Sequence, residues 1–308
     1  MLLGFKDYGA QAQHLAEALG LPYAMVGVHR FPDGECKVTL PGKLPLHVVF
    51  CRSLDDPDDK LIQLLLAATT ARQLGAQRLT LVAPYLCYMR QDRAFAAGEA
   101  VSQPIIGGFL AGLFDDVITV DPHLHRTHDL ADAVPAAHVM ALSAKAAMAE
   151  FLHNYRAAHC EGHADIILLG PDSESEQWVR SLAEASSLAY GVASKQRLGD
   201  REIRVTLPDL DLAAVTVILV DDVISSGETI AVTAQSCLQR GAKSVDVLVT
   251  HPLFAQGAIE RLRQAGVGEI WSTDSISHPS NCIVLTGLIA EAVQSIARTE
   301  AAYSTPQR

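Results

Sequence analysis

The 308-residue sequence lacks several features that would each point to a class of protein. It has no run of 18 or more apolar residues and no basic segment before an apolar core at its start, so we expect neither a membrane span nor a secretion signal. Basic residues are few. The net charge of -11 and the pI near 5.5 argue against broad nucleic-acid binding. The absence of a G-x-x-x-x-G-K-[ST] motif excludes the commonest ATP-binding loop, although it does not exclude ATP.

Paired cysteines are also absent. The six cysteines are scattered and form no C-x-x-C pair: Cys36, Cys51, Cys87, Cys160, Cys237 and Cys282. Reduced thiols in the cytoplasm are the simplest explanation of this pattern. With 49% hydrophobic and 19% charged residues, the chain can bury sizeable cores, and its length suits two domains of about 150 residues each. We therefore expect a soluble, cytoplasmic, two-domain protein.

Short apolar runs alternate with longer amphipathic segments along the whole chain. The runs that predict strands are Leu46–Cys51, Leu79–Ala83, Val117–Val120, Ile166–Leu169, Ile203–Leu207, Val217–Val220, Val245–Thr250 and Ile270–Thr273. Among the segments between them, Lys60–Leu74 predicts a helix. The preceding residues Asp55–Asp59 supply an Asp N-cap, a proline suited to the first turn, and acidic residues that interact favourably with the helix dipole. This alternation predicts an α/β fold with mainly parallel sheets flanked by helices.

The strand–helix series repeats on both sides of a polar stretch around Leu130–Lys145. We therefore expect two similar α/β domains, residues 1–142 and residues 143–308. No low-complexity linker separates the two series, so firmly packed domains are expected.

The most informative segment reads VTVILVDDVISSGETI and begins at Val215. Val217–Val220 predicts a strand buried on both faces, which puts Asp221 and Asp222 at its carboxyl end. Ligands of open α/β sheets bind at that end, where hydroxyls and N–H groups at a helix start can surround a phosphate. The two carboxylates would repel the phosphate, so they are expected to hold the hydroxyls of an attached sugar or a bridging metal ion. An ordinary helix cap would explain only one of the hydroxyl residues.

Two segments of the first half also suit binding. RFPDGE begins at Arg30, and its P-D-G alone is typical of a turn. PYLCYMRQDR begins at Pro84, directly after the predicted strand Leu79–Ala83, which places its arginines beyond another strand's carboxyl end. Arginines there can clamp a polyphosphate through bidentate contacts, and Phe31 can lie against a purine.

Taken together, these segments resemble the ribose-phosphate pyrophosphokinase family. The loop after Val220 is similar to a phosphoribosyl-pyrophosphate motif, FPDGE to the family's F-x-D-G-E, and PYLCYMRQDR to its P-Y-x-x-Y-x-R-Q-D-R. Further similar segments, such as VDPHLH and THPL, extend the resemblance over nearly the whole chain. The resemblance implies two phosphoribosyltransferase-type domains, with ATP motifs in the first and a ribose 5-phosphate loop and a catalytic loop in the second.

The resemblance further implies a magnesium-dependent homo-oligomer, a dimer or hexamer, that transfers the diphosphoryl group of ATP to ribose 5-phosphate. The residues that it assigns to ATP are Phe31, Asp33, Glu35, Arg90, Gln91 and Arg93. Those assigned to ribose 5-phosphate are Asp221, Asp222, Ser225, Ser226, Gly227 and Thr229. Lys195 and Arg197 are assigned to catalysis, and His123 and Asp172 to the Mg²⁺ site.

Some of these assignments depend on the resemblance alone. Lys195 and Arg197 would otherwise be interpreted as solvated surface charges. His123, His125 and His128 would suggest zinc, but no four-ligand set is evident nearby, so one histidine at the magnesium site is the preferred interpretation.

The segment GPDSESEQWVR, which begins at Gly170, departs from the family pattern. Glu174 and Ser175 replace two glycines that let backbone approach a phosphate, and Trp178 replaces an arginine. The SSGET loop also differs from the family's D-T-A-G-T and is closer to the loops of phosphoribosyltransferases. Two alternatives therefore stay open: a phosphoribosyltransferase that consumes phosphoribosyl pyrophosphate, and a non-catalytic regulatory paralogue of the synthetase.

Overall fold

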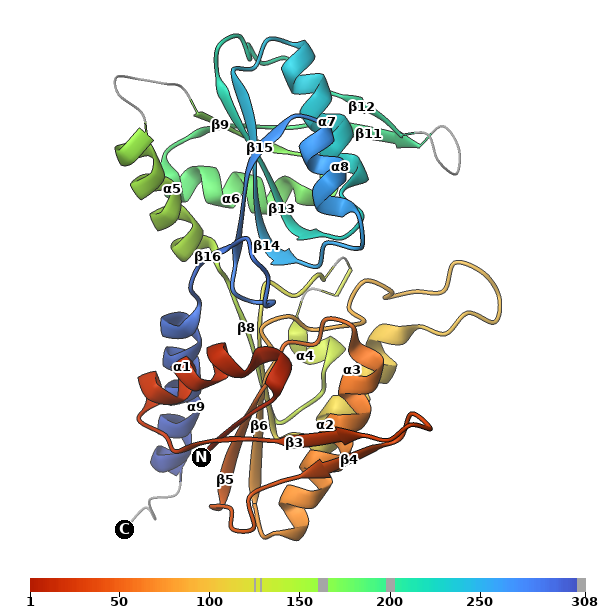
Figure 1. The fold of residues 1–308 in the computed structure, drawn as a ribbon, viewed down its shortest axis with the longest axis vertical. Coiled ribbons are helices and arrows are strands. Elements are labelled where there is room, and N and C mark those ends of the chain that lie inside the picture. Colours follow the sequence, from red (N-terminus) through yellow and green to blue (C-terminus); the bar gives the residue numbers. More distant parts are fainter. Residues whose placement is uncertain (125, 128, 160–165, 198–202, 304–308) are drawn as a thin grey trace. The chain divides into compact units, whose positions relative to one another are not determined.

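The computed structural model describes residues 1–124, 126–127, 129–159, 166–197 and 203–303, which form two compact units (Figure 1). Unit 1 comprises Met1–Leu142, Ser275–Ser277 and Leu285–Arg308. Unit 2 comprises Ser143–Asp274 and His278–Val284. The two units are therefore not two successive halves of the chain, because the C-terminal segment belongs with unit 1.

Unit 1 is built on a six-stranded parallel sheet in the order β2-β1-β5-β6-β7-β8. The strands are β1 (Leu2–Gly4), β2 (Tyr23–Met25), β5 (His47–Cys51), β6 (Arg78–Val82), β7 (Asp116–Val120) and β8 (His138–Leu142). A separate antiparallel hairpin consists of β3 (Gly27–Arg30) and β4 (Cys36–Thr39). The α-helices are α1 (Gly9–Leu19), α2 (Pro57–Gln73), α3 (Ser102–Leu113), α4 (Leu130–Ala133) and α9 (Thr286–Tyr303), and η1 (Lys6–Tyr8) is a 3₁₀ turn.

Helix α9 explains why the C-terminal segment belongs to unit 1. Its residues Ile289, Val293 and Ile296 recur at helical spacing and are all buried. The helix packs against α1, and Ser295 Oγ lies 3.7 Å from Met140 Sδ on β8. The expected assignment of residues 285–308 to the second domain therefore differs from the observed grouping, since an apolar stripe alone does not say which sheet it covers.

Unit 2 repeats this plan with a six-stranded parallel sheet in the order β10-β9-β13-β14-β15-β16. The strands are β9 (Ile166–Gly170), β10 (Ala189–Val192), β13 (Thr216–Ile224), β14 (Ser244–Pro252), β15 (Val267–Thr273) and β16 (Asn281–Ile283). An antiparallel hairpin again follows the second strand, made of β11 (Ser194–Arg197) and β12 (Ile203–Thr206). The α-helices are α5 (Lys145–His159), α6 (Glu176–Ser186), α7 (Glu228–Gln239) and α8 (Ala258–Gln264), and η2 (Ser173–Ser175) is a 3₁₀ turn.

The predicted α/β class with two similar parallel-sheet domains is confirmed, while several details differ. Strand β13 ends at Ile224 rather than at Val220, so the aspartate pair lies within the strand's last residues. The predicted strand at Ile203 forms a hairpin with β11 rather than joining the parallel sheet. At the start of α2, Asp56 is the N-cap but makes no side-chain cap bond, because it has the left-handed conformation with φ 46° instead of the extended one that caps require.

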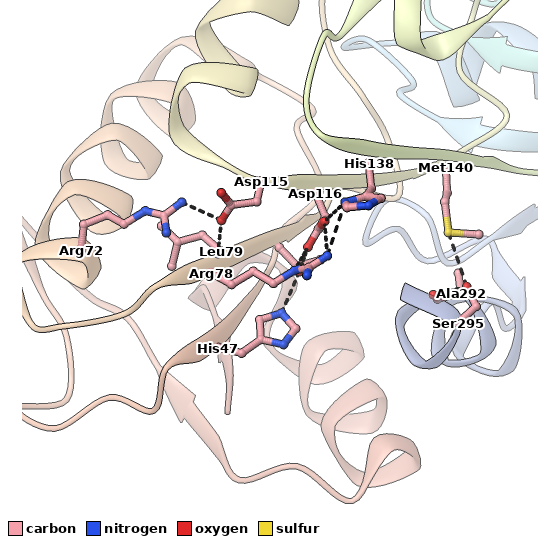
Figure 2. Close-up of polar contacts among 11 residues, drawn as sticks. His47, Arg72, Arg78, Leu79, Asp115, Asp116, His138, Met140, Ala292 and Ser295 are labelled. Atoms are coloured by element: carbon pink, nitrogen blue, oxygen red, sulfur yellow. Dashed lines mark hydrogen bonds and ion pairs between the residues drawn. The ribbon is translucent and has the colours of Figure 1, made fainter. Parts of the chain in front are cut away.

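A polar network joins the amino ends of four neighbouring strands of unit 1, β5 to β8 (Figure 2). Asp116 is fully buried and accepts two bonds of 2.7 Å from Arg78. Thr80 Oγ1 donates to the same carboxylate at 2.6 Å, and His138 Nδ1 lies 3.0 Å from it. His47 Nε2 extends the network, 2.8 Å from Thr80 Oγ1. These contacts help to align β5 to β8 at the amino ends of the strands, away from the carboxyl ends where ligands bind.

The structure also bears on the expected absence of a membrane span and on the state of the cysteines. In the part of the chain that the structure describes, no helix is both long and apolar enough to cross a membrane. Five cysteines are free thiols: Cys36, Cys51, Cys87, Cys237 and Cys282. Cys160 lies outside the described residues.

Candidate active site

The candidate site of unit 2 lies where the strand order of its sheet reverses. Strands β9 and β13 are neighbours, and the chain continues from β9 to β10 on one side and from β13 to β14 on the other. In open parallel sheets this reversal leaves a crevice at the carboxyl ends of the two central strands, where ligands bind. Asp172 follows β9, and Asp221 and Asp222 belong to the end of β13. The fold therefore brings these three carboxylates together at the carboxyl ends of β9 and β13.

The loop from Ser225 to Gly227 leads from β13 into α7. Gly227 is the N-cap of α7 and has a left-handed φ of 70°, which favours glycine at this position. The loop is tied down through its carbonyls, because Ala255 N donates to Ser225 O at 2.9 Å and Arg261 Nη1 to Ser226 O at 2.5 Å. With the carbonyls occupied, the hydroxyls and the first N–H groups of α7 are the donors that an anion at this loop would meet.

The carboxylates of the site strongly influence one another. Partial burial raises the pKa of Asp221 well above its ordinary value, and repulsion by Asp222 and Asp172 raises it further. Asp222 is itself buried, and its N–H donates to Asp221 Oδ1 at 3.0 Å. A cation, or the hydroxyls of a sugar, would relieve this concentration of negative charge.

Lys195, on strand β11, brings a positive charge to the loop between β13 and α7. Its Nζ donates to Thr229 Oγ1 at 2.8 Å and lies 3.7 Å from Asp172 Oδ2. The structure thus places three of the predicted residues from separate parts of the chain within reach of one another. Arg197 pairs with Ile203 through the backbone of the same hairpin, and its side chain lies outside the described part of the chain.

The unusual segment after β9 forms a capped 3₁₀ turn. Asp172 Oδ1 accepts from Glu174 N at 3.0 Å, and Ser175 Oγ donates to Asp172 O at 2.6 Å, which closes the turn. Ser175 is buried beside Gly170, whose added Cβ would lie 2.4 Å from the serine Oγ. Glu174 is exposed. The serine hydroxyl therefore fills this turn, whereas glycines at these positions would leave the backbone N–H groups uncovered.

The residues predicted to bind ATP lie in unit 1, and Phe31–Glu35 forms the tip of the β3–β4 hairpin. Phe31 N donates to Glu35 O at 2.8 Å, and Asp33 Oδ1 accepts from Glu35 N at 3.1 Å, so Asp33 shapes the turn as P-D-G chemistry predicts. The Phe31 ring is 40% exposed and makes a T-shaped contact with the His29 ring, at 4.8 Å between centroids. An exposed aromatic ring at a hairpin tip is available to stack on a base.

The second predicted ATP segment is a long loop after β6. Its Arg90 and Arg93 are exposed, and the Arg93 guanidinium lies 4.7 Å from the centre of the Phe95 ring. Gln91 is held by bonds to the start of α3, with Ser102 Oγ donating to its Oε1 at 2.9 Å.

His123 follows β7 and is half-buried. It belongs to unit 1, whereas Asp172, the other predicted magnesium ligand, belongs to unit 2. His125 and His128 lie outside the described residues.

Three structural roles were missed from the sequence. Asp92 Oδ1 accepts from Arg126 Nη1 at 2.7 Å, which links the loop after β6 to the loop after β7. Arg261 tethers the loop at Ser226, and Thr229 orients Lys195 across 34 positions of sequence. Asp92 lies in the family-like segment PYLCYMRQDR and Thr229 was predicted to bind ribose 5-phosphate, but nothing in the sequence indicated these contacts.

Comparisons with known proteins identify the family of this chain. A family model described as the N-terminal domain of ribose phosphate pyrophosphokinase matches residues 1–112, and one described as a phosphoribosyl synthetase-associated domain matches residues 206–304. Ribose-phosphate pyrophosphokinase of Methanopyrus kandleri is 34% identical over 92% of this chain and 95% of its own. The enzyme of the same name from Saccharolobus solfataricus is 33% identical over 86% and 89%.

The fold was also compared with solved structures. Phosphoribosylpyrophosphate synthetase from Mycobacterium smegmatis superposes with a TM-score of 0.81, covering 97% of this chain and 99% of that one. The two chains are 21% identical, so this likeness establishes the fold alone.

Proposed function

Since this chain belongs to the ribose-phosphate pyrophosphokinase family, we propose that it moves the β,γ-diphosphoryl group of ATP to the anomeric hydroxyl of ribose 5-phosphate. The products would be phosphoribosyl pyrophosphate and AMP. The observation that carries the proposal is the position of Lys195, whose ammonium group lies between Thr229 at the start of α7 and Asp172 after β9. A cation there supports transfer of an anionic group to a sugar held in the loop.

We assign ribose 5-phosphate to the end of β13. Its 5-phosphate would accept hydrogen bonds from the loop donors, namely Ser225, Ser226, Gly227 and Thr229. Asp221 and Asp222 would accept from the ribose hydroxyls, which orients the anomeric hydroxyl for attack. The left-handed Gly227 and the tether from Arg261 hold the loop in the required shape before substrate arrives.

The donor set of the site fits Mg²⁺. Among the described residues no group of three or more His, Cys, Asp or Glu side chains forms a ready-made metal centre. This suits Mg²⁺, which commonly binds through one or two carboxylates together with substrate phosphates and water. We propose that Asp172 of unit 2 and His123 of unit 1 are residues that contribute to Mg²⁺ binding. When bound, the ion would neutralise charge on the transferred phosphates.

In this proposal Lys195 stabilises the negative charge that develops on the transferred group. Diphosphoryl transfer requires little covalent chemistry from the protein, so positioning and cations account for most of the rate. The Thr229 hydroxyl fixes the ammonium group beside the sugar phosphate, and Asp172 holds it from the other side at 3.7 Å. Arg197, two positions along the same strand, is proposed to act with it.

We propose that the adenine of ATP stacks on Phe31, with Asp33 and Glu35 beside it, and that Arg90, Gln91 and Arg93 hold the triphosphate. The exposure of Phe31 and of both arginines supports this assignment. A phosphoribosyltransferase would not need this second set of residues. We further propose a homo-oligomer, a dimer or hexamer, working in the cytoplasm, where its free thiols would stay reduced.

The decisive assay incubates the purified protein with ATP, Mg²⁺ and ribose 5-phosphate and measures AMP and phosphoribosyl pyrophosphate. We expect both products in equal amounts. Failure of both to form over a wide range of concentrations would favour the regulatory paralogue, in which the capped turn at Ser175 blocks the reaction. Release of pyrophosphate from phosphoribosyl pyrophosphate and a free base would instead indicate a phosphoribosyltransferase.

The role of Lys195 has its own test. Lys195→Met should lower kcat by about 10²–10³-fold, because it removes a preorganised charge from the transferred group, while ATP binding changes little. Lys243→Met is the matched control, since Lys243 is an exposed lysine of unit 2 that precedes β14. Wild-type turnover in Lys195→Met would rule out the catalytic assignment. Calorimetric titration with ATP separates loss of binding from loss of turnover.

A further inference from the structure

Unit 1 contains a pocket at the place that corresponds to the candidate site of unit 2. Its strand order reverses between β1 and β5, just as that of unit 2 reverses between β9 and β13. A pocket of about 730 Å³ lies at the carboxyl ends of β1 and β5 and is lined by residues that follow both strands, including Phe5, Lys6, Asp7, Arg52, Asp56 and Lys60. This volume is in the usual range for small-molecule sites. None of the residues assigned above to ATP or ribose 5-phosphate lines it.

The loop at this pocket shares one backbone feature with the loop that follows β13 in unit 2. In each unit the strand leads through a short loop to a helix whose N-cap is left-handed and makes no side-chain cap bond. In unit 2 that residue is Gly227, with φ 70° and ψ 6°, whereas in unit 1 it is Asp56, with φ 46° and ψ 67°. Aspartate adopts this conformation more readily than most residues that have a side chain, so unit 1 forms the turn without a glycine.

Two buried polar atoms next to each other in sequence lack partners at the end of β5. Among the residues that the structure describes, Arg52 Nη1 and Ser53 Oγ are the buried side-chain polar atoms without a hydrogen-bond partner. The Arg52 side chain is only 6% exposed; its Nε donates to Asp7 Oδ2 at 3.1 Å and its guanidinium lies 4.2 Å from the Phe5 ring centre. An unpaired buried donor is costly, so an acceptor from a ligand would be favourable here.

The charges around the pocket are mostly committed to one another. Asp7 pairs with Arg52 and with Lys60 Nζ at 3.0 Å; these two cations overcome its partial burial and lower its pKa. Lys60 also donates to Asp55 Oδ1 at 2.8 Å. Asp59 is held by two bonds from Arg30.

Among the described lining residues, Lys6 makes no ion pair and is exposed, which leaves its ammonium group and Arg52 Nη1 as available donors. Two free cationic donors beside a helix N-terminus favour an oxyanion. Asp56, also without a polar partner in the described chain, can accept from a hydroxyl group on the same ligand.

We propose that the pocket between β1 and β5 is a second ligand site that binds phosphate, either free or as a small phosphate monoester, through Arg52 and Lys6. It is separate from the site at β13. In unit 2 aspartates stand at the end of the strand beside the loop, whereas in unit 1 an arginine follows the strand, so this second site takes its positive charge from the strand end itself.

The test uses the full chain carrying Ser225→Ala and Thr229→Val, which weaken phosphate binding at the other loop. Inorganic phosphate and glycerol 3-phosphate are each titrated by calorimetry into this protein and into versions with Lys6→Gln, Arg52→Gln or Lys43→Gln added. Lys43 is an exposed lysine of unit 1 that does not line the pocket. We expect Lys6→Gln to weaken binding about fivefold and Arg52→Gln about tenfold or more, with no change in Lys43→Gln.

The ligands distinguish the two sources of the phosphate group. Equal binding of both probes indicates free phosphate, and tighter binding of glycerol 3-phosphate indicates a phosphorylated metabolite held also by Asp56. Equal affinity in Lys6→Gln and Lys43→Gln, or no binding of either probe, would overturn the proposal. Because Lys6 is exposed, its variant decides the outcome even if Arg52→Gln fails to fold. The product assay described above is independent of this result.

Discussion

The network around Asp116 should be a major source of stability in unit 1, and Asp116→Asn tests this with minimal change in volume. The carboxylate is fully buried and is bound by Arg78, Thr80 and His138, all within 3.0 Å (Figure 2). The Arg78 side chain is itself only 12% exposed. Removing one partner of a buried ion pair leaves the other charge uncompensated, which costs about 3–5 kcal/mol. We expect Asp116→Asn to lower the free energy of unfolding by that amount.

Replacing both partners should cost much less than the sum of the single changes. Arg78→Met combined with Asp116→Leu leaves no unpaired charge, and such apolar replacements are often close to neutral. We therefore expect a coupling energy larger than about 1 kcal/mol in the double-mutant cycle. Purely additive single changes would contradict the idea that the two residues act as a pair.

Urea denaturation measures this effect with two probes. Both tryptophans of the chain, Trp178 and Trp271, belong to unit 2, so their fluorescence follows that unit, whereas far-ultraviolet circular dichroism follows both. A loss visible by dichroism but not by fluorescence would place it in unit 1. A free energy of unfolding for Asp116→Asn within 1 kcal/mol of wild type would refute the reasoning.

The pH dependence has a definite sign. Although burial alone would raise it, the pKa of Asp116 is lowered from 3.8 by its bonds to Arg78 and Thr80. A carboxyl with a depressed pKa stabilises the folded state above its unfolded pKa, and this contribution is lost as the pH falls through the folded value. The difference between wild type and Asp116→Asn should therefore be constant from about pH 5 to 7 and shrink below about pH 4.

Two further predictions concern the packing of helix α3 and the contact that holds Ser226. Gly107→Ala should destabilise unit 1 by several kcal/mol, because the new Cβ would lie 1.7 Å from a carbonyl oxygen of α4. Gly108→Ala meets no atom within 4 Å and should stabilise α3 by up to about 1 kcal/mol, and thermal unfolding compares the two variants. Arg261→Met should raise the KM for ribose 5-phosphate about tenfold by releasing Ser226, while Arg263→Met on the same helix should not; steady-state kinetics distinguishes the two.

The fold was predictable where strands are long and buried. Val217–Val220 is apolar at every position and lies at the centre of a parallel sheet, where no face meets water. The sequence did not predict β1, which is buried but only three residues long, or the exposed hairpin strand β3, which has no buried face to impose a period of two. A pattern of burial identifies a strand only when the strand is long enough to repeat it.

The candidate site was predictable as a set of residues but not as a set of contacts. The small, hydroxyl-rich turn after β13 revealed the loop, because its chemistry is local in sequence. The bond from Lys195 to Thr229 joins two elements 34 positions apart and depends on how the β11–β12 hairpin lies against α7. Likewise, Ser175 could be identified as a replaced glycine, but only the structure shows its hydroxyl closing the turn at Asp172.

The repeated topology explains why chemistry differs between two similar units. Both sheets place a strand end, a short loop and a helix N-terminus at the point of strand reversal, so the backbone of each would suit an anion there. Side chains then determine which ligand fits. In the two proposed sites, Asp221 and Asp222 of unit 2 would favour a ligand with hydroxyls or a bound cation, while Arg52 of unit 1 would supply a positive charge instead. One backbone arrangement can thus serve two ligands because the residues at the strand end set the sign of the local charge.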